Sequence, residues 1–324
     1  DYTLNRNQGL FFKLRNFKKA LVQIKSYNKE IQCGEEIAHL QGIGKGVITR
    51  INEILSKGNL DEIKTNKNNS QVKINEINEK KNLQKITGIG PVKAEKLFND
   101  NITLKIILQK YKENPENEFF DNFTHHQMIG IKYFEDIENR IPRNEIESIE
   151  TYIKKLNKKI DSKLQVTVCG SYRRKKSDCG DIDVIITHPS IIEENDLKKC
   201  EFLNEIIKHM KKSKFLVDDL TYKGNTKYMG LCKIQKYARR IDIRLIPLDC
   251  YGSALLYFTG SGDFNKNMRK YALKKNMTLN EYGLFHYKNK LKYDKIQTSS
   301  EKDIFDKLGL DYVEPEDRVN DYKF

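Results

Sequence analysis

The sequence predicts an α+β protein of several domains, helical in its amino-terminal part and with a mixed sheet further along the chain. Apolar residues recur at three- and four-residue spacing in residues 10–24 and 48–55, as on one face of a helix. Short β-branched runs bounded by Gly and Asp begin only after residue 163. The 324 residues are enough for two or three domains of about 150 residues, each with its own core.

The charge balance restricts the class of partner. The chain has 59 Lys and Arg against 45 Asp and Glu, a net charge of +14, and such a surface attracts polyanions. Its 17 Tyr, 15 Phe and 38% hydrophobic residues exclude a disordered basic tail. We expect a soluble protein without membrane contact or secretory signal, because no apolar run reaches the roughly 18 residues that cross a bilayer. Six scattered cysteines without a C-x-x-C pair argue against structural zinc and disulfides, and favour a reducing compartment.

Two similar glycine turns lie in the helical part. Residues 40–46 read LQGIGKG and residues 86–91 read ITGIGP, and helices are predicted to follow over residues 47–55 and 92–98. Gly permits turns that leave backbone N–H groups exposed at the start of the next helix, where phosphate binds. A single copy could equally be an ordinary helix cap. Two copies in a basic protein favour helix-hairpin-helix motifs that bind the DNA backbone.

The segment between these turns is polar. Residues 65–81, TNKNNSQVKINEINEKK, offer little to bury, so we expect a linker or a long surface loop and a domain boundary there. A second helical stretch is expected over residues 83–140. The sheet is then predicted from three runs, residues 164–171, 181–187 and 239–247, with a helix over residues 196–212 between the last two.

A group of carboxylates carries the strongest chemical signal. Asp181 and Asp183 lie two residues apart on a predicted strand and therefore point the same way. Asp242 supplies a third carboxylate from a neighbouring strand. Such like charges are unfavourable alone, and together they can hold two Mg²⁺ ions roughly 3.5–4 Å apart. A D-x-D pair by itself is common at solvated strand ends, but Ser171 and Arg174 just upstream add donors for phosphate oxygens.

The segment 256–269, LYFTGSGDFNKNMR, adds a second group of polar residues. Asn265 and Arg269 are four residues apart, so on a helix they share a face and could reach the edge of a base pair. Considered alone, this segment is more typical of a turn before a core-packed helix.

Taken together, these motifs resemble those of the family X DNA polymerases, of the beta type. The resemblance extends over nearly the whole chain, through residues 125–134, 140–143, 170–174, 180–183, 239–247, 257–261, 264–269 and 301–305. It implies a helical lyase-type domain followed by fingers-, palm- and thumb-type subdomains, the palm with a nucleotidyltransferase sheet. These parts correspond to residues 1–65, 66–140, 141–250 and 251–324.

The resemblance also implies the roles of individual residues. Asp181, Asp183 and Asp242 would bind two Mg²⁺ ions, for which Mn²⁺ could substitute, with Arg240 and Arg244 supporting them. The contacts to the dNTP, by its triphosphate, sugar and base, would come from Arg140, Ser171, Arg174, Gly180, Tyr257, Phe258, Gly260, Asn265 and Arg269. Backbone carbonyls of the two hairpins would bind Na⁺ or K⁺ at Ala38, Leu40 and Ile43, and at Gln84, Ile86 and Ile89.

Several positions depart from the family pattern. Arg50 stands where the lyase domain has its Schiff-base lysine, and a guanidinium stays protonated and cannot form an imine. Lyase activity is therefore doubtful. The lyase pocket also differs at Gly46, Glu62 and Phe12, although Lys13, Lys19 and Lys45 remain as other amines. Gly262 replaces an acidic residue beside the incoming base, which would loosen nucleotide selection.

The sequence thus favours a DNA-templated polymerase that fills short gaps in base excision repair. Its expected partners are gapped or nicked duplex DNA and a dNTP, with repair proteins as further candidates and a monomer as the expected state. The alternatives are a template-independent terminal nucleotidyltransferase, disfavoured by the short segment 235–238, and a catalytically silent DNA-binding protein. Nuclear residence is the family default, with viral or organellar residence as the alternative.

Overall fold

The computed structural model describes residues 8–61, 67–221, 224–288, 291–319 and 322–324. The chain divides into two compact units, residues Asp1–Asn117 and Glu118–Phe324. None of the described helices is both long and apolar enough to span a membrane. Each unit is considered by itself below.

The regular elements described in the first unit are all helices. Its elements are α1 (Gln8–Lys25), a 3-10 turn η1 (Gly34–Ile37), α2 (Lys45–Lys57), α4 (Lys67–Leu83), α5 (Pro91–Asn99) and α6 (Leu104–Glu113). Ala20, Ile37 and Ile43 form a small core with partly buried residues of α1 and α2. The predicted helices over residues 47–55 and 92–98 are confirmed as α2 and α5.

The prediction of a linker or loop over residues 65–81 is wrong for residues 67–81, which belong to α4. Lys, Glu and Gln are good helix formers even where a segment has little apolar surface. The carboxyl-terminal end of α4 is also anchored, because Leu83 is fully buried. Lys80 nearby donates to Glu76 at 2.7 Å and lies 5.0 Å from the ring centroid of Phe98 on α5. A polar sequence can therefore be ordered by packing at one end. Residues 65 and 66 lie outside the described part of the chain.

The second unit begins with helices and contains the main sheet. Its first elements are η2 (Glu118–Phe120), α7 (His125–Lys132), α8 (Phe134–Glu138), β1 (Ile141–Pro142) and α9 (Arg143–Ile160). The sheet consists of β2 (Gln165–Val168), β4 (Ile182–Thr187), β5 (Leu216–Asp219), β6 (Lys227–Cys232) and β7 (Arg239–Leu245), in the order β2-β4-β7-β6-β5. β4 and β7 are parallel and the other neighbours antiparallel, so the predicted mixed sheet is confirmed.

Short elements connect these strands. They are α10 (Gly170–Arg173), β3 (Asp178–Cys179), α11 (Glu194–Leu197) and α12 (Phe202–Lys212). The three predicted strands are β2, β4 and β7, while β5 and β6 were not predicted. The helix expected over residues 196–212 is divided into α11 and α12.

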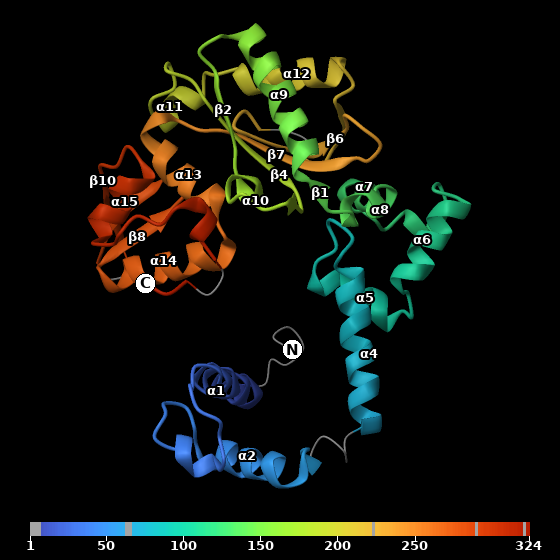
Figure 1. Cartoon of the computed structure of the whole chain (residues 1–324). Helices are drawn as coiled ribbons and strands as arrows, with labels where there is room; N and C mark the ends of the chain where they lie inside the picture. Colours follow the sequence, from blue (N-terminus) through green and yellow to red (C-terminus); the bar gives the residue numbers. More distant parts are fainter. Residues whose placement is uncertain (1–7, 62–66, 222–223, 289–290, 320–321) are drawn as a thin grey trace. The chain divides into compact units, whose positions relative to one another are not determined.

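One face of the main sheet is buried under α9 and α12 (Figure 1). Ile182, Val184 and Ile186 of β4 and Ile241 and Ile243 of β7 all belong to this core. Because side chains alternate along a strand, the residues between them point to the opposite face. The sheet therefore presents Asp183, Asp242 and Arg244 on the side away from α9 and α12, whereas Arg239 of β7 lies on the buried face and pairs with Glu145 of α9.

The carboxyl-terminal part has a separate core and a second sheet. It comprises η3 (Leu248–Cys250), α13 (Tyr251–Thr259), α14 (Gly262–Lys274), β8 (Met277–Asn280), β9 (Gly283–Lys288), β10 (Leu291–Ile296), α15 (Glu301–Leu308) and η4 (Pro315–Asp317). The three strands form an antiparallel sheet in the order β10-β9-β8. Phe264, Met268 and Ala272 are fully buried along α14, so the segment after the glycine turn is a core-packed helix, as the sequence predicts.

Candidate active site

Two of the three predicted metal-binding carboxylates lie on adjacent parallel strands. Asp183 of β4 and Asp242 of β7 are register partners, so their side chains leave the sheet side by side on the face opposite α9 and α12. The neighbours of Asp242 on β7 are buried in the core, which fixes its orientation. Asp181 immediately precedes β4. The predicted proximity of Asp183 and Asp242 thus follows from one parallel strand pair.

A glycine allows the chain to pass close to these carboxylates. Gly170 begins α10 with φ of +57°, and a Cβ placed there would lie 2.6 Å from Oδ2 of Asp183. Any other residue would therefore displace the carboxylate and adopt a backbone conformation that L residues rarely take. The Gly-Ser motif places Ser171 and Arg174 beside the carboxylates because Gly170 permits this approach.

A cavity of about 750 Å³ brings most of the predicted site together. It is lined by Asp181, Asp183 and Asp242 with Arg240, and by the predicted nucleotide contacts Ser171, Arg174, Tyr257, Phe258, Gly260, Asn265 and Arg269. Arg140 and Gly180 are not among the lining residues. They lie next to each other, since a Cβ on Gly180 would be 3.1 Å from Nη1 of Arg140.

The cavity is also lined by basic side chains that the sequence analysis did not identify. Lys227 of β6 is the register partner of Arg244, and both line the cavity. Lys266 and Lys270 of α14 line it too, one helical turn apart. The alternation in KYMGLC could have identified β6 and placed Lys227 on the same face as Asp242. Two positive side chains directly opposite each other on adjacent strands repel each other. The negative charges of the nearby carboxylates offset the repulsion between Lys227 and Arg244.

Burial disfavours the charged form of two of the carboxylates. Burial and then the charge of Asp242 raise the pKa of Asp183 to about 7. Burial also raises the pKa of Asp242, although the positive charges of Arg240, Lys227 and Arg244 oppose the change. Oδ1 of Asp242 is buried and finds no hydrogen-bond partner among the described residues. An orphaned carboxylate oxygen beside a second carboxylate is the arrangement that a hard divalent cation stabilises.

The third carboxylate is held by an arginine. Asp181 accepts a hydrogen bond from Nη2 of Arg240, with both side chains partly exposed. In the described part of the chain, no three acidic, His or Cys side chains already form a group able to hold a metal ion. Asp181 is thus paired with Arg240 just before the strand that carries Asp183.

The aromatic wall of the cavity is fixed by polar contacts. Asn265 donates to the backbone oxygen of Tyr257 at 2.6 Å, and the guanidinium of Arg269 lies 4.9 Å from the Tyr257 ring centroid. The guanidinium of Arg244 likewise lies 5.6 Å from the ring centroid of Phe258. Asn265 and Arg269 both line the cavity, so they share a face of α14 as expected.

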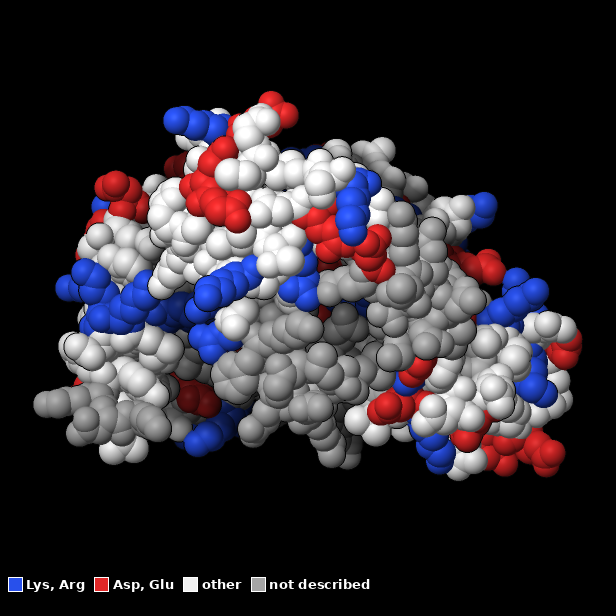
Figure 2. Space-filling view, turned by 90° about the horizontal axis from the view of Figure 1, so that it is seen from below, with Lys and Arg blue, Asp and Glu red and all other residues white. Residues whose placement is uncertain are grey.

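Figure 2 shows a band of Lys and Arg side chains across its left half, and such gathered charge favours a polyanion.

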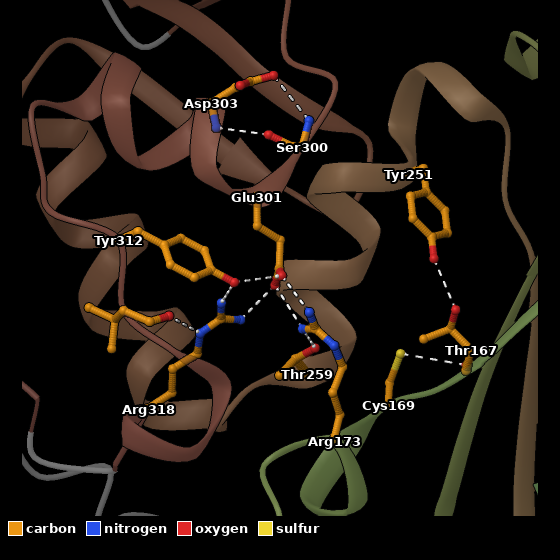
Figure 3. A network of polar contacts seen from close by, with 11 residues as sticks. Thr167, Cys169, Arg173, Tyr251, Thr259, Ser300, Glu301, Asp303, Tyr312 and Arg318 are labelled. Atoms are coloured by element: carbon orange, nitrogen blue, oxygen red, sulfur yellow. Dashed lines mark hydrogen bonds and ion pairs between the residues drawn. The ribbon is translucent and has the colours of Figure 1, made fainter.

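A buried ion-pair network attaches α10 to the carboxyl-terminal part (Figure 3). Arg173 donates to both oxygens of Glu301, at 3.0 and 2.7 Å, and to the hydroxyl of Thr259 at 2.6 Å. The next residue, Arg174, donates to the backbone oxygen of Thr259. Two consecutive arginines therefore connect α10 and its Gly-Ser turn to the end of α13.

The two glycine hairpins have matching geometry. Gly42 and Gly88 have φ of +93° and +89°, and α2 and α5 then begin after Gly44 and Gly90 without a side-chain cap. In the turns, Ile43 donates its N–H to the Leu40 oxygen at 3.1 Å, and Ile89 donates to that of Ile86 at 3.0 Å. Of the other predicted carbonyl positions, Ala38 and Gln84 lie two residues before Leu40 and Ile86. Cation binding by these carbonyls stays a prediction.

Arg50 lies in the first hairpin unit with its guanidinium engaged. Nη1 donates to the backbone oxygen of Gly46 at 2.7 Å, and the guanidinium lies 5.3 Å from the Phe17 ring centroid. Lys19 and Lys45 are exposed. Glu62 and the side chains of Phe12 and Lys13 lie outside the described residues.

Comparison with known proteins agrees with this geometry. Family models for the DNA polymerase beta palm and thumb match residues 140–248 and 254–319. Models for a helix-hairpin-helix domain and for the fingers domain of DNA polymerase lambda match residues 2–60 and 81–138. The chain belongs to the family X DNA polymerases. The family resemblance in the sequence, and the expected order of helical, fingers-, palm- and thumb-type parts, are confirmed.

Three relatives illustrate the extent of the similarity. DNA polymerase lambda from Arabidopsis thaliana is 30% identical over 321 residues, which are 94% of this chain and 57% of the relative. DNA polymerase lambda from Rattus norvegicus is 30% identical over 96% of this chain and 53% of the relative. DNA nucleotidylexotransferase from Xenopus laevis is 28% identical over 93% of this chain and 63% of the relative. This family X chain thus spans little more than half the length of the curated relatives it matches.

Proposed function

We propose that this chain is a DNA-directed DNA polymerase that copies a template across short gaps during base excision repair. In this reaction the primer 3′-oxygen attacks the α-phosphate of a dNTP and pyrophosphate leaves. The observation that supports it most is the single cavity that joins the carboxylates of β4 and β7 to the Gly-Ser turn and to α13 and α14. Binding a dNTP takes carboxylates that can hold metal ions beside the triphosphate and aromatic side chains that can contact the sugar. This cavity has both.

The residues present fit divalent cations. Asp183 and Asp242 would hold them together with Asp181, and Mg²⁺ or Mn²⁺ at this place supplies Lewis-acid activation and charge neutralisation. Ser171 and Arg174 would bind the triphosphate through hydroxyl and guanidinium donors. Tyr257, Phe258 and Gly260 would line the sugar, and Asn265 and Arg269 would contact the minor-groove edge of the new base pair.

DNA would be held in two ways. The uncapped starts of α2 and α5 leave backbone N–H groups available to phosphates, and the monovalent cations proposed at the hairpins would add to this. Lys266, Lys270 and Lys274 are exposed at four-residue spacing on α14 and would contact the DNA backbone through charge. Gapped or nicked duplex DNA is the substrate that suits both sets of contacts.

Primer extension on a defined gapped template tests the templated reaction. Each dNTP is supplied alone, and we expect efficient incorporation only of the one complementary to the template base. Asp242→Asn should reduce incorporation at least about a hundredfold, because several kcal/mol of transition-state stabilisation depend on this carboxylate. Asp306→Asn, which removes an exposed carboxylate on α15, is the matched control and should retain activity.

A terminal nucleotidyltransferase is the second candidate, because one relative carries that activity in its name. Residues 233–238 join β6 to β7 in a short turn, and this speaks for templated synthesis, since the family's template-independent members have a long loop there. Incorporation that is indifferent to the template base would favour the transferase. Full activity of Asp242→Asn would overturn the assignment of Asp242 to the metal site, and a wild type that extends no primer would leave only a DNA-binding protein.

A further inference from the structure

Arg140 is engaged by a carboxylate of its own chain. Its Nε and Nη2 donate to Oδ1 of Asp178 at 2.9 and 2.6 Å, and Nη2 also donates to the Asp178 backbone oxygen at 3.2 Å. The pair is built by the backbone, because β1 and β3 form a two-stranded sheet in which Pro142 is the register partner of Asp178. The geometry therefore follows from the fold and not only from two flexible side chains.

This pair borders the candidate active site. Nη1 of Arg140 would be 3.1 Å from a Cβ on Gly180, the residue before Asp181 of the cavity. Ile141, the residue after Arg140, is the register partner of Cys179, so Arg140 lies beside the short strand that leads to Asp181. Arg140 therefore borders the end of the cavity that contains Asp181.

We propose that Asp178 is a positioning residue that competes with the triphosphate of the incoming nucleotide for Arg140. This inference rests on the proposed function. A carboxylate and a phosphate use the same donors of a guanidinium, so the nucleotide must displace Asp178 before Arg140 can bind it. The exposed fractions of the two side chains, 58% and 49%, describe an ion pair weak enough to be opened in this way.

The competition has a distinctive kinetic effect. Releasing Arg140 strengthens a contact that the triphosphate makes equally in the ground state and the transition state, so KM falls while kcat stays the same. A residue that merely held β3 in place would change kcat or stability instead. The effect should also shrink at high ionic strength, because exposed ion pairs are screened.

The experiment measures single-nucleotide gap filling by the full chain with Mg²⁺ and each dNTP. Asp178→Asn is expected to lower KM about two- to fivefold, the range that an exposed ion pair supplies, with kcat unchanged. Asp178→Ser should give the same result, and both should keep the thermal unfolding midpoint of the wild type. Asp306→Asn, which opens an ion pair of similar exposure on α15, should leave KM unchanged.

A double variant tests whether the effect passes through Arg140. Arg140→Gln alone should raise KM, and adding Asp178→Asn in that background should change nothing further. The proposal is overturned if Asp178→Asn leaves KM unchanged, or if Arg140→Gln alone leaves KM unchanged. It is also overturned if Asp178→Asn lowers KM by the same factor in the Arg140→Gln background as in the wild type. If the wild type extends primers on a template and any of these results is found, only the proposed competition for Arg140 is overturned. If the wild type extends no primer, the proposed polymerase function is overturned as well.

Discussion

The guanidinium of Arg318 is fully buried and donates to Oε1 of Glu301 at 2.6 Å. Glu301 also accepts hydrogen bonds from Arg173 of α10, so one carboxylate is shared between two arginines. The hydroxyl of Tyr312 completes the group, 3.3 Å from Oε2 of Glu301. This network joins the turn that carries Ser171 and Arg174 to α15, and its integrity should matter to both stability and catalysis.

Replacing Glu301 with Gln should destabilise the protein strongly. The substitution preserves shape but leaves Arg173 and Arg318 as buried cations without a counter-charge, a change that typically costs about 3–5 kcal/mol. Urea unfolding followed by circular dichroism measures it. Glu316→Gln, which opens the exposed pair with Lys175, is the control and should change stability by less than about 0.5 kcal/mol. Equal effects of the two substitutions would contradict the role of the buried network.

The same carboxylate predicts a pH dependence of stability. Burial alone would raise the pKa of Glu301, but the hydrogen bonds from Arg173 and Arg318 outweigh it and hold the pKa below its ordinary value. A lowered folded-state pKa contributes stability above the unfolded value of about 4.3, and this contribution is lost as the pH falls through the folded value. The stability difference between wild type and Glu301→Gln should therefore shrink below about pH 4. A difference that stays constant down to pH 3 would argue against this.

Gly170→Ala should abolish most nucleotide incorporation. Its Cβ would lie 2.6 Å from Oδ2 of Asp183, so the carboxylate must move, and the backbone conformation costs roughly a further 1–2 kcal/mol. Gly309→Ala is a matched control, because Gly309 has φ of +70° at the end of α15 and a Cβ there would meet nothing within 4 Å. The control should lose similar stability yet still extend primers. Primer extension and thermal unfolding of both variants separate strain from displacement of Asp183.

Borohydride trapping on a 5′-deoxyribose-phosphate substrate tests the lyase function. The wild type should give no covalent adduct, because the guanidinium of Arg50 cannot form an imine. Arg50→Lys should produce one, since it places a primary amine between the Phe17 ring and the Gly46 carbonyl where Arg50 now lies. Lys45→Ala in the Arg50→Lys background is the control and should leave the adduct unchanged. An adduct of the wild-type protein that maps to any lysine would show that another amine has replaced the missing one.

Local patterns predicted the core elements of the fold. The β-branched runs identified β2, β4 and β7, and the Gly-Ile-Gly repeats identified the starts of α2 and α5, because each depends on contacts close in sequence. The same reasoning failed for α4, whose polar residues give no amphipathic signal and whose order depends on Leu83 and Lys80 packing onto other helices. β6 was also missed, and with it Lys227 in the cavity.

The sequence by itself determined which groups are available: two carboxylates at strand positions and a third just before a strand, a Gly-Ser-x-Arg-Arg turn, and Asn265 with Arg269 one helical turn apart. Strand alternation and helix periodicity fix those directions without any distant contact. Only the tertiary structure decided which partners they meet. Three such pairs join segments up to 128 residues apart: Asp181 with Arg240, Arg140 with Asp178, and Arg173 with Glu301. Charge pairing acts through space, so these contacts are set by how strands and helices pack and leave no periodic trace along the chain.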